Sequence, residues 1–152
     1  MIEIKLLPTT SISYPIGIDM KGTLNYIAQA AMEFQKIYGS RPYTTNLFCR
    51  GSSGAILAGL FTSHFPDSNM RIIHIKKEGE WSHSGCVSCG FESQAINVII
   101  DDFISSGETI RDIYHKAKEY TDRGREFKID VLIVGWGYRE DLGFEPVYLI
   151  SK

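Results

Sequence analysis

The stretch that decides the fold runs from Val98 to Thr109 and reads VIIDDFISSGET. It continues an apolar run, Ile96 to Ile100, that only Asn97 interrupts. Such a run is typical of a strand covered on both faces, as in a parallel sheet. We expect a loop from Asp101 to Gly107 to follow, and ligands of open α/β sheets bind at this carboxyl edge. The stretch therefore predicts an α/β fold with a ligand site directly after the strand.

The rest of the chain alternates between the patterns that strands and helices produce. The expected helices carry apolar residues at three- and four-residue spacing, and the expected strands are short apolar runs. This order predicts a central, mostly parallel sheet flanked by helices, in a single domain of residues 1–152. We expect strands at Ile2–Leu7, Asn46–Cys49, Arg71–Ile75, Ile129–Val134 and Val147–Ile150, and helices from the capping residue Asp19 to Tyr38, at Ala55–Thr62 and at Glu108–Tyr120.

Composition limits the function classes. A chain of 152 residues with 43% hydrophobic residues can bury the core of one globular domain. The formal net charge of -2 gives no general attraction to nucleic acid or to an acidic membrane. No apolar run is long enough to span a bilayer, and Met1 to Thr10 lacks the pattern of a signal peptide. The 3 cysteines, an odd number, do not suggest a disulfide scaffold. We therefore expect a cytoplasmic protein with reduced thiols.

Two kinds of polar group adjoin each other in the deciding stretch. Ser105, Ser106, Gly107 and Thr109 surround the expected start of a helix, where backbone N–H groups, hydroxyls and the helix dipole favour a phosphate. The preceding carboxylates repel a phosphate but accept hydrogen bonds from a neutral diol. A phosphate next to a diol describes a ribose 5-phosphate. The alternative stays open that Ser105 and Glu108 form a capping box and that the carboxylates are solvated.

This stretch resembles the signature with which type I phosphoribosyltransferases bind phosphoribosyl pyrophosphate (PRPP). That signature is a hydrophobic strand, two acidic residues, two variable residues and a small-residue loop ending in Thr or Ser. The resemblance implies a glycosyltransferase of nucleotide salvage that transfers ribose 5-phosphate from PRPP to a nucleobase and releases pyrophosphate. Asp101 and Asp102 would hold the ribose hydroxyls and, directly or through water, Mg²⁺. The loop from Ser105 to Thr109, Glu108 included, would hold the 5-phosphate.

Two further loops fit the same family in the same order along the chain. Cys49–Gly54 resembles its pyrophosphate loop, in which Arg50, Gly51 and Ser52 would bind pyrophosphate oxygens. The alternative is an ordinary strand-to-helix turn capped by Ser52 or Ser53.

Lys76–Gly85 resembles the mobile catalytic loop of orotate- and adenine-type members. The resemblance implies that Lys77 and His83 stabilise the leaving pyrophosphate. The family's further lysine is missing from this loop, and a solvated strand end is the alternative for Lys76 and Lys77. We expect Glu78–Gln94 to be the most mobile internal segment and to act as a lid.

In the family, a hood over the sheet edge selects the base, and here residues 1–19 and 136–152 remain to form a small one. Trp136, Tyr138 and Phe144 are candidates to stack on a base, and ordinary packing is the alternative for each. Ser105 stands where hypoxanthine and guanine relatives usually carry an aspartate. This favours an orotate-like or adenine-like base, and we nominate Arg139 as the cation for an orotate carboxylate.

Three other interpretations stay open. The first is a regulatory protein that binds PRPP or a nucleotide with the same fold and no turnover. The second is a diphosphokinase-type relative of PRPP synthase. The third is a zinc protein, in which His83, Cys86 and Cys89 would be joined by His74 or Cys49. The resemblance also leaves room for a homodimer.

Overall fold

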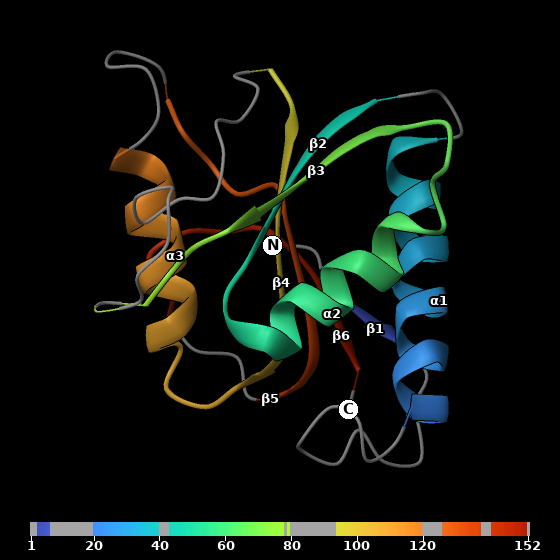
Figure 1. The fold of residues 1–152 in the computed structure, drawn as a ribbon, viewed down its shortest axis with the longest axis horizontal. Coiled ribbons are helices and arrows are strands. Elements are labelled where there is room, and N and C mark those ends of the chain that lie inside the picture. Colours follow the sequence, from blue (N-terminus) through green and yellow to red (C-terminus); the bar gives the residue numbers. More distant parts are fainter. Residues whose placement is uncertain are drawn as a thin grey trace.

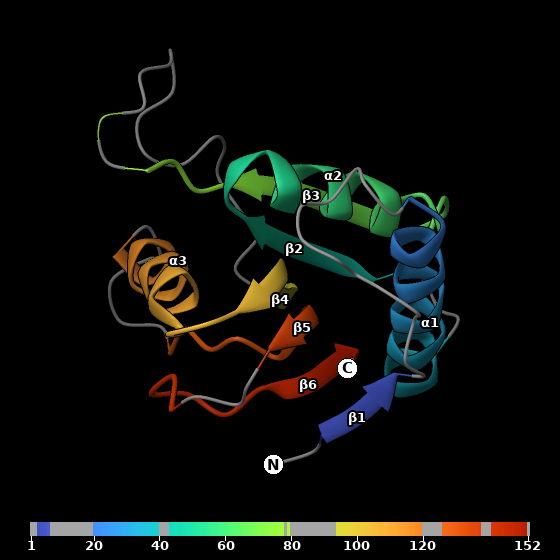
Figure 2. The same cartoon turned by 90° about the horizontal axis from the view of Figure 1, so that it is seen from below.

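A single parallel sheet forms the centre of the molecule. The computed structural model describes residues 3–6, 20–39, 43–77, 79, 94–119, 126–137 and 141–151. Within them the sheet has 6 strands in the order β1-β6-β5-β4-β2-β3. Each strand runs parallel to its neighbours, so the carboxyl ends of all strands lie at one edge of the sheet. Figure 2 shows the strands fanning out in this order, from β1 to β3.

Strands and helices follow one another as the sequence predicts, with shifts at their ends. The predicted α/β fold class and its parallel sheet are confirmed. The described helices include none that is long and apolar enough to cross a bilayer. In chain order the elements are β1 (Glu3–Leu6), α1 (Met20–Tyr38), β2 (Thr44–Cys49), α2 (Gly51–Thr62), β3 (Asn69–His74), β4 (Ile96–Ile104), α3 (Glu108–Glu119), β5 (Val131–Gly137) and β6 (Val147–Ser151) (Figure 1).

Each face of the sheet has its own apolar core. Helices α1 and α2 cover one face and α3 covers the other (Figures 1 and 2). Leu47 and Cys49 of β2 belong to the core under α1 and α2, whereas Phe48 between them belongs to the core under α3. This alternation is what a strand covered on both faces requires, since successive side chains point to opposite faces.

The prediction that a loop begins at Asp101 was wrong, because β4 continues to Ile104. The partner strand β5 also continues, and it pairs Phe103 with Trp136 and Ile104 with Gly137. The acidic pair therefore lies inside a strand, and the loop is reduced to residues 105–107.

The helix expected from Ala55 begins earlier, at Gly51. Small residues let this first turn approach the sheet closely. A Cβ added at Gly54 would lie 3.2 Å from the Cβ of Cys49 and 3.6 Å from the carbonyl oxygen of Ile100. Gly54 therefore brings the start of α2 against the carboxyl ends of β2 and β4.

Parts of the segments expected to form a hood are strands. Residues 3–6 form β1, residues 147–151 form β6, and these two strands pair with each other. They extend the sheet rather than cover its carboxyl edge.

Candidate active site

One cavity lies at the carboxyl ends of the adjacent strands β2 and β4. Its volume is about 330 Å³, which is in the range that holds a small ligand. The expectation that Arg50 and Asp101 lie at the same sheet edge is confirmed, because both line this cavity. Every described residue that was predicted to bind PRPP or Mg²⁺, or to act in catalysis, lines it as well: Arg50, Gly51, Ser52, Lys77, Asp101, Asp102, Ser105, Ser106, Gly107, Glu108 and Thr109. Sequence reasoning missed four more lining residues, namely Ser53, Phe103, Ile104 and Ile110.

The acidic pair is buried near the carboxyl end of β4. Asp101 is 7% exposed and Asp102 is 8% exposed. Each carboxylate accepts a backbone N–H, from Asp102 to Asp101 Oδ1 at 2.9 Å and from Phe103 to Asp102 Oδ1 at 3.0 Å. Burial, and then the adjacent Asp102, raise the pKa of Asp101 to about 8, although Arg50 acts in the opposite direction. The pair therefore carries less negative charge at neutral pH than two exposed carboxylates would. A cation bound beside the pair would lower the pKa of Asp101 and favour full ionisation of both carboxylates.

The charge of the pair also affects two further buried side chains. Burial raises the pKa of the Cys49 thiol to about 12, with Asp101 adding to the shift. A thiol held protonated in this way is a poor nucleophile and a poor metal ligand. Burial also raises the pKa of Tyr26, and Asp101 and Asp102 raise it further. Both side chains therefore remain neutral beside the carboxylates.

The loop of residues 105–107 turns the chain from β4 into α3. Gly107 has a φ of 71°, a left-handed conformation that glycine adopts at no steric cost. The Glu108 N–H donates to Ser106 Oγ at 3.4 Å, so Ser106 makes the cap contact that the capping box would have assigned to Ser105. The N-terminus of α3 thus faces the cavity with its backbone donors close to the glycine, which suits an anion.

A second helix start lies at the same cavity. Arg50 is the N-cap of α2 and makes no side-chain cap, so the turn capped by Ser52 or Ser53 is not found. Gly51 has a φ of 69°, and a Cβ added there would meet no heavy atom of the described residues within 4 Å. The first backbone N–H groups of α2 can therefore meet a ligand at close range.

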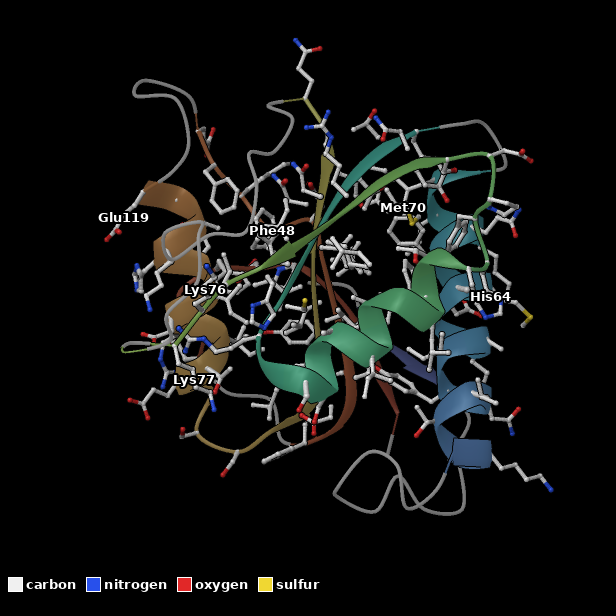
Figure 3. The ribbon with its side chains drawn as sticks, viewed as in Figure 1. Phe48, His64, Met70, Lys76, Lys77 and Glu119 are labelled. Atoms are coloured by element: carbon white, nitrogen blue, oxygen red, sulfur yellow. The ribbon has the colours of Figure 1, made fainter. Side chains whose placement is uncertain are left out.

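Arg50 is held by protein groups on two sides. Its side chain is 7% exposed, and Nη1 donates to Asp112 Oδ2 at 3.0 Å. Nη2 donates to the carbonyl oxygen of Lys76 at 3.3 Å, which also accepts a bond from Lys116 Nζ at 3.3 Å. Figure 3 labels Lys76 and Lys77, which follow β3. These bonds connect the expected pyrophosphate loop, the start of the expected catalytic loop, and α3.

Several candidates fall outside the described residues. These are the side chain of Trp136, the residues Tyr138 and Arg139, the ligand candidates His83, Cys86 and Cys89, and all of the expected lid Glu78–Gln94 except Gly79 and Gln94. Among the described residues there is no cluster of three or more side chains suited to a metal.

Phe144, the remaining candidate to stack on a base, stacks instead on Tyr114. The two ring centroids are 4.7 Å apart with an interplanar angle of 26°. Tyr114 in turn packs against Phe127 with centroids 5.8 Å apart. In this structure Phe144 therefore has the packing role.

No protein-family model matches the sequence, and no curated protein is significantly similar to it. Solved structures do match. The purine phosphoribosyltransferase from Pyrococcus horikoshii aligns over 100% of this chain and 89% of its own, with 16% identity and a TM-score of 0.52. The xanthine-guanine-hypoxanthine phosphoribosyltransferase of Helicobacter pylori aligns over 99% and 86%, with 10% identity and a TM-score of 0.54. The hypoxanthine phosphoribosyltransferase of Trypanosoma cruzi aligns over 84% and 73%, with 15% identity and a TM-score of 0.54.

At these identities the likeness establishes the fold. The chain has the type I phosphoribosyltransferase fold, as the deciding stretch of the sequence predicts.

Proposed function

We propose that the protein is a PRPP-dependent phosphoribosyltransferase. The observation that carries this proposal is a cavity lined by both a buried acidic pair and two helix N-termini, each with a left-handed glycine. A sugar diol suits the carboxylates, and the phosphate groups at the two ends of PRPP suit the two helix starts. The Pyrococcus, Helicobacter and Trypanosoma structures carry the names of enzymes with this activity, which supports the same assignment.

Each group of the cavity would have one task in the transfer. Gly107 and its neighbours would bind the 5-phosphate, and Gly51 and Ser52 would bind the pyrophosphate. Lys77 would stabilise the charge that gathers on the pyrophosphate as its bond to the anomeric carbon breaks. Asp102, with Asp101, would orient the ribose hydroxyls near the positive charge that develops on the sugar. A ring nitrogen of the base would form the new bond to that carbon, and the proton that this nitrogen loses would pass to water or to the leaving pyrophosphate.

The donor set fits Mg²⁺. Two adjacent buried carboxylates are hard oxygen ligands. Burial and the neighbouring Asp102 raise the pKa of Asp101, so a cation bound beside the pair would stabilise its ionised form. Asp101 and Asp102 would hold the ion directly or through water. When bound, it would neutralise part of the negative charge of the pyrophosphate leaving group.

The identity of the base that accepts the ribose 5-phosphate is the most detailed part of the proposal. The three neighbours named above act, by their names, on purine bases. A purine is therefore the base class that they support, and they give no support to the expected preference for an orotate-like or adenine-like base. Adenine remains compatible with both this class and the serine at position 105. Phe103 and Ile104 supply apolar lining to the cavity against which a base can lie.

The proposal is tested by incubating the protein with radiolabelled PRPP, Mg²⁺ and adenine, hypoxanthine, guanine, xanthine, orotate or uracil in turn, and separating the nucleotides. We expect one purine nucleoside monophosphate to form, together with one equivalent of pyrophosphate. The matched control is Asp102→Asn, which removes a carboxylate from the cavity and should abolish product.

Binding of PRPP without any product would assign the protein to the regulatory interpretation. Absence of both binding and product would refute the proposal.

A further inference from the structure

Arg111 joins two segments that are far apart in the sequence. It lies in the first turns of α3, and it is not among the residues that line the described cavity. Its Nη2 donates to the carbonyl oxygen of Ser106 at 2.6 Å, and its Nη1 donates to the carbonyl oxygen of Asp141 at 3.0 Å. Its backbone N–H donates to the carbonyl oxygen of Gly107 at 2.9 Å. Arg111 therefore contacts the carbonyl groups on both sides of the Gly107 residue.

The hydrogen bond from Arg111 to the Ser106 carbonyl determines the direction in which the Gly107 N–H points. A peptide unit is planar and trans, so the Ser106 carbonyl and the Gly107 N–H point in opposite directions. Because the carbonyl points to the Arg111 guanidinium, the N–H points away from it. Gly107 itself lines the cavity. A cationic donor on the carbonyl also polarises the peptide unit and makes its N–H a stronger donor.

The other partner of Arg111 is firmly anchored. In the turn that follows Asp141, the Gly143 N–H donates to Asp141 Oδ1 at 3.0 Å, and Leu142 is only 3% exposed. Phe144 stacks on Tyr114 of α3. The guanidinium therefore fixes the loop of residues 105–107 against a turn that is itself attached to α3 and to the core. A lysine has one ammonium on a flexible stem and cannot reproduce this planar two-carbonyl bridge.

We propose that Arg111 is a positioning residue of the 5-phosphate site, which holds the Gly107 N–H in the direction that a bound phosphate needs. This inference rests on the proposed function, since it assumes that a sugar phosphate binds at residues 105–109. It adds a residue that lies outside the signature and outside the cavity, and that acts on the ligand only through the backbone.

The experiment titrates ribose 5-phosphate into protein labelled with ¹⁵N-glycine and follows the Gly107 amide resonance. Wild type, Arg111→Met and Arg111→Lys are compared, with Lys118→Met as the matched control. Lys118 lies on the same helix, and its Nζ is 5.8 Å from the centroid of the Tyr114 ring. We expect Arg111→Met to weaken binding about tenfold or more and to reduce the Gly107 shift, because the Gly107 N–H is no longer held toward the phosphate and the charge-assisted bond between them is lost. Arg111→Lys should be intermediate, and Lys118→Met should match wild type.

Turnover gives a second readout, namely the KM for PRPP against the KM for the base. A positioning role raises the KM for PRPP and leaves the KM for the base unchanged, whereas general loosening of the fold raises both. Equal raising of both constants, or ribose 5-phosphate binding in Arg111→Met as tight as in wild type, would overturn the inference. If Arg111→Met does not fold, wild-type binding in Arg111→Lys would overturn it too. Failure of wild type itself to bind ribose 5-phosphate would instead overturn the proposed function.

Discussion

Alanine variants of the two left-handed glycines in the cavity should distinguish the effect of backbone strain on stability from the effect of a lost ligand contact on affinity. Gly51 and Gly107 have φ values of 69° and 71°, and both line the cavity. Gly39 has a φ of 80° at the end of α1, and a Cβ added there would meet no heavy atom of the described residues within 4 Å. Replacing each glycine with alanine imposes similar strain, but only two of the three positions can face a ligand.

The expected magnitudes follow from this geometry. An L-residue in the left-handed region costs about 1–2 kcal/mol, so each variant should lose roughly that much free energy of unfolding. A domain of ordinary stability, about 5–15 kcal/mol, stays folded after such a loss. For a chain of this size the Tm falls by roughly 2–4 °C for each kcal/mol. Losing one hydrogen bond to a charged phosphate group costs about 1.5–3 kcal/mol, which is roughly a tenfold to hundredfold loss of affinity.

Thermal unfolding and calorimetric titration with PRPP and Mg²⁺ measure the two effects. We expect all three alanine variants to show a lower Tm, and only Gly51→Ala and Gly107→Ala to bind PRPP more weakly. Equal affinity for PRPP in Gly39→Ala and Gly107→Ala would show that no phosphate approaches the Gly107 backbone, and the site would have to be abandoned.

Three further variants test the charges around the cavity. The folded protein retains a proton on Asp101 up to the raised pKa of about 8, whereas the unfolded chain releases it near 3.8. The free energy of unfolding of wild type should therefore fall as pH rises from 3.8 to about 8. Urea titrations at each pH should show a smaller fall for Asp101→Asn. Asp112→Asn should cost no more than about 1 kcal/mol in the same assay, since water screens the half-exposed Asp112 carboxylate and the asparagine oxygen can still accept a hydrogen bond from Arg50. A loss above twice that value would contradict this account of the Arg50 pair. Lys77→Met should weaken magnesium pyrophosphate binding several-fold, and calorimetry should find a smaller effect at high salt; an unchanged affinity would remove Lys77 from the site.

Much of the fold and the place of the site could be predicted from local patterns. The apolar run before Asp101 identifies a strand covered on both faces, and the glycine and serines after it indicate a helix start at the carboxyl edge. Both patterns depend only on neighbouring residues. Parallel pairing then brings Arg50 and Asp101 to the same edge, although they are distant in sequence.

The extent of β4 could not be predicted in this way. Two aspartates normally indicate a chain leaving the sheet, but here β5 continues and pairs with Phe103 and Ile104. The start of α2 was missed for a related reason. Glycine and serine at positions 51–54 favour a loop by propensity, whereas the structure uses their small size for close packing on the strand ends.

The residues that hold the loops in place could not be predicted either. Arg50 and Asp112 are separated by 62 residues, and Arg111 and Asp141 by 30. Such bonds depend on how α3 lies against the sheet, which no local pattern records. Arg111 and Asp112 look like ordinary exposed charges on an amphipathic helix until that arrangement is known.

The most direct test of the account is a crystal structure of the protein with PRPP and Mg²⁺, or with ribose 5-phosphate where PRPP is hydrolysed. We expect the 5-phosphate at the N–H groups of residues 107–109 and the ribose hydroxyls within hydrogen-bonding distance of Asp101 and Asp102, with the guanidinium of Arg111 still bound to the Ser106 carbonyl. A sugar phosphate bound elsewhere, or bound here in the reverse direction with its hydroxyls away from the acidic pair, would contradict the central claim.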